Sequence, residues 1–327
     1  LGDVHRMLNE YTPARERYEQ ALELYQSIGA RLGEANCKQA LGDVHYMLDE
    51  YAPARERYGQ ALENYIAIGD RLGEANCKKS LGDVHSGLGE YQAARDDYQD
   101  AMALSDCIGN QSSAADACGR LAQALAQMKA VDQADEKCKE VIARYQALGD
   151  PVQLAWGYNS VGNVYDILKQ FEKAVSAYQE AVKLSLENAL LYRNLAASAI
   201  KANQQVVAGQ ALSTAERLQP KHPYLPVRRA QLALAYGNGS EALAQVDIAL
   251  TQPGAPVSLA YWVKALALLL LSRLIEACKA MESCIAATSD PHDFDDYLEE
   301  AHQFMLDHPD AGGMDKLIAL IKDAQTL

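Results

Sequence analysis

Positively charged residues are in the minority in this 327-residue chain. It contains 30 Lys and Arg residues against 44 Asp and Glu residues, which gives a net charge of −14. A surface that binds nucleic acid or an anionic membrane needs clustered positive charge. The composition therefore argues against nucleic acid and membranes as partners.

Long apolar segments are missing as well. The longest apolar run, residues 265–271, lies between Lys264 and Arg273. It is far shorter than the roughly 20 residues that cross a bilayer, so it predicts a buried helix. The sequence starts at Leu1 in the middle of a repeat and shows no signal peptide. We interpret it as part of a longer, cytoplasmic polypeptide.

The motifs of common catalytic and cofactor sites are also absent from the sequence. It has no phosphate-binding GxxxxGK loop, no GxSxG elbow and no HExxH pair. We therefore expect neither enzymatic activity nor a cofactor. The seven cysteines include no CxxC pair, the spacing that structural zinc sites favour. They fall on helical patterns and are expected to be small buried thiols in a reducing cytosol.

Internal repetition is the main feature that is present. The pentapeptide LGDVH occurs at Leu1, Leu41 and Leu81, and residues 1–40 match residues 41–80 at 30 of 40 positions. Small residues continue the period through eight units, in steps of 40, then 34 or 35. One such series is Gly2, Gly42, Gly82, Ala122, Gly162, Ala196, Ala230 and Ala265. Small residues at a fixed register predict close approach of two helices in every unit.

Each unit has two stretches with apolar residues three or four positions apart, for example 32–49 and 51–69, which predicts two helices. Gly29, Gly69, Gly109 and Gly149 are expected to end the second helices. Asp150 and Pro151 are expected to start the next helix. The longer period before residue 185 predicts about three more residues in each helix. Two further helices are expected near 293–308 and 312–325.

This pattern resembles the tetratricopeptide repeat family. The signature residues of the second unit are Leu41, Gly42, His45, Tyr51, Ala54, Tyr58 and Ala61. The 40-residue form looks like the repeats of kinesin light chains, of Pins-type adaptors and of arrays in signalling ATPases. The resemblance implies an all-α superhelix (solenoid) of about eight helix-turn-helix units plus a terminal helical pair. We expect repeats of the long period over 1–185, repeats of the short period over 186–288, and capping helices over 289–327.

The resemblance also implies a concave groove that is lined by the first helix of each unit. Side chains one turn apart on these helices are the candidate peptide-binding residues: Asn36, Gln39, Asp43, Tyr46, Asn76, Lys79, Asp83, Gln123, Trp156, Asn159 and Asn163. Asp43, Asp83, Gln123 and Asn163 share one register with Asp3, and we call this series the polar ladder. An exposed polar ladder suits an extended or basic peptide, and an ordinary solvated helix face would have the same composition. Asp residues replace the Asn and Lys of the family's chaperone-binding forms, which argues against that role.

Two groups of residues offer a metal site as an alternative. His5, His45 and His85 repeat every 40 residues, but stacked helices hold equivalent residues about 8–10 Å apart, too far for one ion. We interpret these histidines as fillers between helices. The acidic cluster from Asp290 to His308 is better explained by residues that start helices. No metal is expected.

The sequence therefore predicts a non-catalytic scaffold that binds a protein or peptide in the groove. The alternative is a sensor or regulatory arm of a larger signalling enzyme, with an NTPase, protease or nuclease domain in the same polypeptide. The start of the sequence within a repeat favours this alternative.

Overall fold

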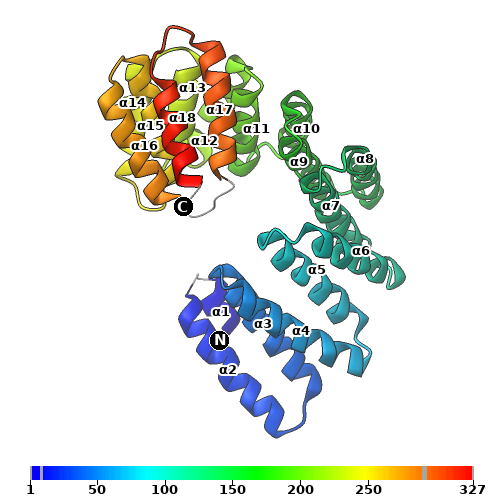
Figure 1. Ribbon diagram of the computed structural model, residues 1–327. Helices are drawn as coiled ribbons and strands as arrows, with labels where there is room; N and C mark the ends of the chain where they lie inside the picture. The colour runs from blue at the N-terminus through cyan, green and yellow to red at the C-terminus, as the bar shows by residue number, and fades with distance from the viewer. Residues whose placement is uncertain (1, 8–9, 289–292, 326–327) are drawn as a thin grey trace. The chain divides into compact units, whose positions relative to one another are not determined.

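The computed structural model describes residues 2–7, 10–288 and 293–325, and these form eighteen helices and no strand (Figure 1). The first ten are α1 (Gly2–Met7), α2 (Tyr11–Ser27), α3 (Arg31–Met47), α4 (Tyr51–Ile68), α5 (Arg71–Gly87), α6 (Tyr91–Cys107), α7 (Gln111–Gln127), α8 (Val131–Leu148), α9 (Pro151–Ile167) and α10 (Phe171–Leu184). The others are α11 (Ala189–Lys201), α12 (Gln205–Leu218), α13 (Leu225–Ala235), α14 (Gly239–Leu250), α15 (Val257–Leu270), α16 (Leu274–Ala287), α17 (Asp293–Asp307) and α18 (Met314–Gln325).

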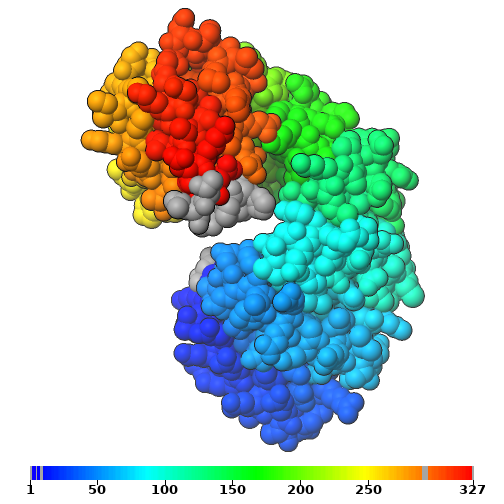
Figure 2. Space-filling model, viewed as in Figure 1, coloured from blue at the N-terminus to red at the C-terminus, as the bar shows by residue number. Residues whose placement is uncertain are grey.

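The helices form two compact units, Leu1–Leu184 (unit 1) and Ser185–Leu327 (unit 2). Within each unit, consecutive helices pack in antiparallel pairs, and each pair stacks on the next, so the chain colours follow one another in order in the space-filling view of unit 1 (Figure 2). The predicted all-α superhelical repeat architecture is therefore confirmed. The proposed break at residue 289 falls on residues outside the described ones and stays a prediction.

Helix length differs between the two units. Helices α2 to α9 have 17 or 18 residues, whereas α11 to α16 have 11 to 14. The extra residues of the 40-residue period are thus placed in the helices, as the sequence predicts, except in α10, which has 14 residues. Each added turn of helix lengthens the face that a first helix presents by about 5.4 Å.

The small-residue register is explained by tyrosine rings in unit 1. A Cβ atom added to Gly42 would lie 2.6 Å from the ring of Tyr58, and one added to Gly82 would lie 2.6 Å from Tyr98. Carbon atoms prefer separations of about 3.5–4.0 Å, so only Gly leaves room for the ring. Gly2 and Gly162 are packed in the same way, against Tyr18 and Tyr178.

The small residue and its partner vary together along the chain. The partner follows the small residue by 16 positions in all eight units, and it is Tyr wherever the small residue is Gly. The other four pairs are Ala122 with Cys138, Ala196 with Leu212, Ala230 with Val246, and Ala265 with Met281, and all eight residues are buried. The predicted close approach is therefore confirmed, and in the Gly units the group that requires it is an aromatic ring.

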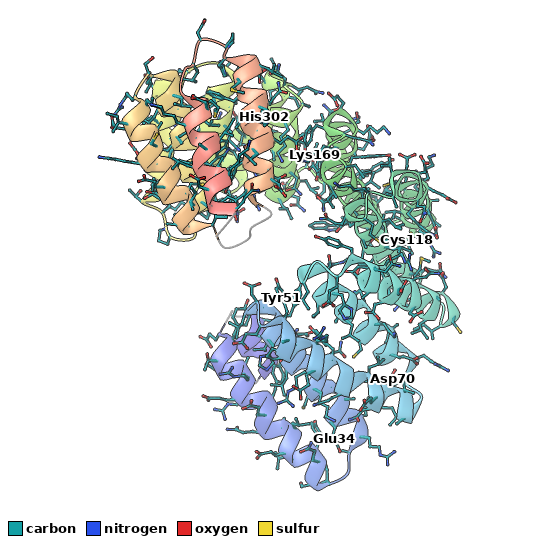
Figure 3. All side chains as sticks on the ribbon, in the orientation of Figure 1. Glu34, Tyr51, Asp70, Cys118, Lys169 and His302 are labelled. Atoms are coloured by element: carbon teal, nitrogen blue, oxygen red, sulfur yellow. The ribbon has the colours of Figure 1, made fainter. Side chains whose placement is uncertain are left out.

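The turns between pairs follow the sequence prediction. Gly69 and Gly149 adopt φ angles of 73° and 70° and end α4 and α8 in the left-handed conformation that glycine adopts at low cost. Asp150 starts α9 by accepting a hydrogen bond from the backbone N–H of Val152, with Pro151 in the first turn. Asp70, labelled in Figure 3, caps α5 in the same way, through the N–H groups of Leu72 and Gly73.

The terminal helices α17 and α18 share the core of unit 2. Phe294, Tyr297, Ala301 and Phe304 of α17 are buried in one apolar cluster with Trp262 of α15. The ring centroids of Trp262 and Tyr297 lie 5.2 Å apart, and the Trp262 indole N–H donates to Glu300 Oε2 at 2.6 Å. Trp262 is consequently 0% exposed. The predicted terminal pair is present. Its helix α17 covers Trp262 of α15, which is the first helix of the last repeat.

Cysteine and histidine side chains are mostly structural. Five of the seven thiols are buried, including Cys118 within α7 (Figure 3), while Cys278 is half-buried; the expectation of buried thiols is wrong for Cys107, which is exposed at the end of α6. His45 Nδ1 lies 2.5 Å from Glu50 Oε2, and His85 Nδ1 lies 2.8 Å from Asp97 Oδ2. Both histidines therefore occupy space between helices, as predicted, and each is also hydrogen-bonded to a carboxylate.

Candidate functional site

The polar ladder is bonded to the second helices of unit 1. The hydroxyl of Tyr58 donates to Asp43 at 2.9 Å, and that of Tyr98 donates to Asp83 at 2.7 Å. The same bond, always over 15 residues, joins Tyr18 to Asp3 at 2.6 Å and Tyr178 to Asn163 at 2.6 Å. Each ladder residue thus accepts a hydrogen bond from the ring that packs on the glycine beside it. Gln123 is the exception, because Cys138 replaces the tyrosine of its unit.

The two central ladder carboxylates are also paired with arginines. Arg6 donates to Asp43 at 2.7 Å, and Arg120 donates to Asp83 at 2.9 Å. The side chains of Asp43 and Asp83 are only 26% and 16% exposed. The expectation of an exposed row of acceptors is therefore wrong at these positions. The carboxylate oxygens of Asp43 and Asp83 already accept hydrogen bonds from tyrosine and arginine side chains of the protein itself.

Burial controls the protonation of this network. It raises the pKa of the Asp43 and Asp83 carboxyl groups, while the tyrosine hydroxyls and arginine charges beside them act in the opposite direction. Burial, reinforced by the neighbouring carboxylates, also raises the pKa of Tyr58 and Tyr98, so their hydroxyls remain protonated donors. The network therefore joins neighbouring helices of unit 1.

Other predicted residues on α3 and α5 are partly used in the same way. The Tyr65 hydroxyl donates to Asn36 Oδ1 at 2.7 Å and lies 2.9 Å from Gln39 Oε1. Tyr46 is half-buried, with its ring centroid 5.8 Å from that of Tyr51, and burial raises its pKa. Asn76 is half-buried on α5.

A hollow of about 590 Å³ opens on helices α5, α7 and α9 of unit 1. Five of the eleven predicted residues line it: Lys79, Gln123, Trp156, Asn159 and Asn163. The other six, on α3 and α5, are not part of its lining: Asn36, Gln39, Asp43, Tyr46, Asn76 and Asp83. The structure thus concentrates the C-terminal half of the predicted site in one cavity.

The charged part of this hollow includes Arg120, which the sequence prediction omitted, together with Asp116 of α7. Lys79 Nζ lies 2.8 Å from Asp116 Oδ2, and the Arg120 guanidinium contacts Asp116 at 3.8 Å besides Asp83. Arg120 was missed because its register holds Ala40, Ser80 and Ser160 in the other units. The signal that could have found it is the 37-residue spacing of bonds between neighbouring first helices, which Arg6–Asp43 and Lys79–Asp116 share.

The α9 wall of the hollow is neutral and includes one aromatic side chain. Trp156 of α9 is 41% exposed. Gln123 Nε2 donates to Ser160 Oγ at 3.3 Å, and Ser112 donates to Gln153 Oε1 at 2.9 Å. Carboxamides and hydroxyls can both donate and accept hydrogen bonds, and an indole adds apolar area with one N–H donor. This wall can bind a segment with backbone amides and one flat or apolar side chain.

The described part of the chain shows neither a group of metal-binding side chains nor a membrane-spanning helix. None of its His, Cys, Asp and Glu side chains come together in a group of three that could hold a metal ion. The alternative metal residues at 290–292 and the side chains of His5 and Asp293 lie outside the described residues. No described helix is both long enough and apolar enough to cross a membrane.

Comparisons with known proteins agree with the observed architecture. Sequence models of the tetratricopeptide repeat match residues 1–67, 113–187 and 75–105, and no curated protein matches the chain. A Rap protein complexed with competence and sporulation factor is similar over 98% of this chain and 84% of its own, with TM-score 0.59 and 14% identity. A tetratricopeptide repeat protein from Parabacteroides merdae covers 88% of this chain and 98% of its own, with TM-score 0.58 and 12% identity. The apo form of RapI covers 90% and 98%, with TM-score 0.58 and 12% identity. At these identities the solved structures support the fold, and together with the matched repeats they show that the chain belongs to the tetratricopeptide repeat family.

Proposed function

We propose that unit 1 is a protein-interaction module that binds an extended peptide segment in the hollow on α5, α7 and α9. The observation that carries this proposal is the hollow itself, with its neutral hydrogen-bonding wall and the 41%-exposed Trp156. Its volume of about 590 Å³ is within the range of about 300–1,000 Å³ that is typical of ligand sites. The complex of a structurally similar Rap protein with competence and sporulation factor supports a binding role for such an array.

The residues of the hollow have distinct roles in this proposal. Trp156 contacts an apolar or planar side chain of the ligand, because a half-exposed indole gains most from burial. Gln123 Oε1 and Asn163 Nδ2, which make no hydrogen bond among the described residues, hydrogen-bond the ligand main chain, which presents one donor and one acceptor per residue. Asn159 is 8% exposed and is not assigned to the ligand. Lys79 and Arg120 hold the Asp116 side chain in place at the edge of the hollow. Asp43 and Asp83 are not assigned to the ligand, because tyrosine and arginine already bond them.

Binding is tested by selecting peptides from a random displayed library on the full chain. We expect selected peptides to lose at least ten-fold affinity for Trp156→Ala and to keep their affinity for Val152→Ala. Val152 is the matched control, since it is 54% exposed on the same helix and does not line the hollow. Equal affinity for wild type and Trp156→Ala would refute the assignment.

The two tryptophans provide a second readout. Trp156 is exposed and Trp262 is fully buried, so acrylamide quenches mainly Trp156. A bound peptide should protect that quenchable fraction, and Trp156→Phe should abolish it. The seven free thiols fit a reducing compartment, and we include the cytosol in the proposal.

A further inference from the structure

Unit 2 contains a basic segment within an acidic chain. Between Glu187 and Glu241 the sequence has six Lys or Arg residues and a single acid, a net charge of +5 in a chain of −14. The acid, Glu216, is already paired with Arg229 at 2.6 Å. The segment therefore offers no second carboxylate to Arg193, Arg217 or Lys221.

Arg193 of α11 is a half-buried cation of this segment. It lines a hollow of about 580 Å³ together with Ser185, Asn188 and Gln219, and Glu187 also contributes to the lining. Its only side-chain partner among the described residues is neutral, since it donates to Gln219 Oε1 at 2.6 Å. A guanidinium has five N–H donors, so most of them remain available to a ligand.

Glu187 is the one acid in the lining of this hollow, and it forms no ion pair with Arg193 within 4.0 Å among the described residues. Burial lowers the pKa of Arg193, and burial together with the Arg193 charge lowers the pKa of His222. Arg217 and Lys221 are exposed in the same stretch of chain and have no acidic partner within 4.0 Å among the described residues. We call Arg193, Arg217, Lys221, His222 and the adjoining hollow the Arg193 surface.

We propose that the Arg193 surface binds an acidic segment of a partner protein, one of whose carboxylates enters the hollow and accepts hydrogen bonds from the Arg193 guanidinium. Charge complementarity selects this partner, because a confined arginine without a counter-ion gains most from a carboxylate, which can bond it in a bidentate manner. A nucleic acid fits less well, since its many phosphates would meet only this small group of cations and the net charge of −14 repels it. The site lies in unit 2 and is independent of the hollow proposed for unit 1.

The probe for this proposal is a fluorescein-labelled hexaglutamate peptide, titrated with the full chain by fluorescence anisotropy. Arg193→Gln is expected to weaken binding at least ten-fold, and Lys221→Gln, on an exposed position, two- to five-fold. The matched control is Arg31→Gln, which removes one exposed charge from α3 in unit 1 and should leave affinity within two-fold of wild type. Affinity should fall as salt rises, because the contacts are ionic.

Further measurements separate the alternatives. An oligothymidylate of similar charge and inorganic phosphate serve as competitors, and stronger binding of either than of hexaglutamate would overturn the acidic-protein assignment. Unchanged hexaglutamate affinity in both Arg193→Gln and Lys221→Gln would also overturn it, and circular dichroism confirms that the variants are folded. Trp156→Ala should leave hexaglutamate binding unchanged, so this site and the peptide site of unit 1 can fail separately.

Discussion

Equivalent positions of the first helices differ in character between the two units. In unit 1 one register holds Gln39, Lys79, Gly119 and Asn159, and in unit 2 the same register holds Arg193, Val227 and Trp262. Gln39 and Lys79 are polar and half-buried, and Asn159 is polar and 8% exposed where it lines the hollow, whereas the apolar side chains of Val227 and Trp262 are 0% exposed. The comparison teaches that the repeat specifies the backbone, while the side chains of one register decide whether a face binds a ligand or packs against the protein's own helices.

The largest expected effect comes from exchanging the two tryptophans for alanine. Trp262→Ala should destabilise unit 2 by about 3–5 kcal/mol, because it leaves a cavity beneath Tyr297 and removes the bond to Glu300. Trp156→Ala should change the free energy of unfolding by less than about 0.5 kcal/mol, because the side chain is half-exposed. Urea unfolding of both variants measures the difference. Similar losses in the two variants would contradict the contrast between the units.

The tyrosine bonds of unit 1 give the next effect. Tyr98→Phe should cost about 1.5–3 kcal/mol, because the buried Asp83 carboxylate loses a hydrogen bond of the charge-assisted kind. Tyr145→Phe is the control, since its hydroxyl makes no hydrogen bond among the described residues and its side chain is also buried, at 8% exposed against 3% for Tyr98. Thermal unfolding compares the two, and equal stability would show that the Asp83 bond contributes nothing.

The pairing of glycine with tyrosine is tested by a double-mutant cycle. Gly82→Ala should cost about 1–3 kcal/mol in the wild type, since its methyl group overlaps the Tyr98 ring. In a Tyr98→Cys background, which imitates Ala122 and Cys138, the same substitution should cost close to nothing. Gly82→Leu should be worse than Gly82→Ala in either background. The same penalty for Gly82→Ala in both backgrounds would disprove the coupling.

The smallest effect concerns the unit that lacks the ladder bond. The Tyr165 hydroxyl of α9 donates to Asp135 of α8 at 2.8 Å and holds the pKa of Asp135 below its usual range, with help from Lys139 and Lys173. A depressed folded-state pKa gives stability that is present above the unfolded pKa of about 3.9 and is lost as pH falls through the folded value. Asp135→Asn should therefore lose part of the acid dependence of stability between pH 5 and pH 2, as measured by urea unfolding at each pH. An identical pH profile would show that this bond does not stabilise the fold.

The helices and turns could be predicted because their causes are local. Glycine at 69 and 149, Asp150 with Pro151, and the apolar spacing each act within one or two turns of the chain. The small-residue register could also be predicted, but the residue that explains it, Tyr58 or its equivalent, lies 16 positions further along the chain. That step is constant in all eight units, so the sequence contained the signal.

The candidate site was predicted less well because its bonds cross between helices. Asp43 looked exposed from helical spacing alone, yet Arg6 of the preceding first helix and Tyr58 of the next helix both bond it. A polar side chain can bind a ligand only if no residue of a neighbouring helix already bonds it. The periodicity of a single helix does not reveal such partners. Trp156 was found because it shares the register of Asn36 and Asn76 on the predicted first helices.

The linked glycine and tyrosine residues also constrain how an array of this kind can change by recombination. A crossover between two units in the loop before a first helix keeps each glycine with its own ring. A crossover between the first and second helices could instead join Gly82 to a partner such as Cys138, leaving a void, or Ala122 to a tyrosine, producing a clash. Duplication of whole 40-residue units, as in residues 1–80, preserves the match, and engineered arrays should be cut at the same boundary.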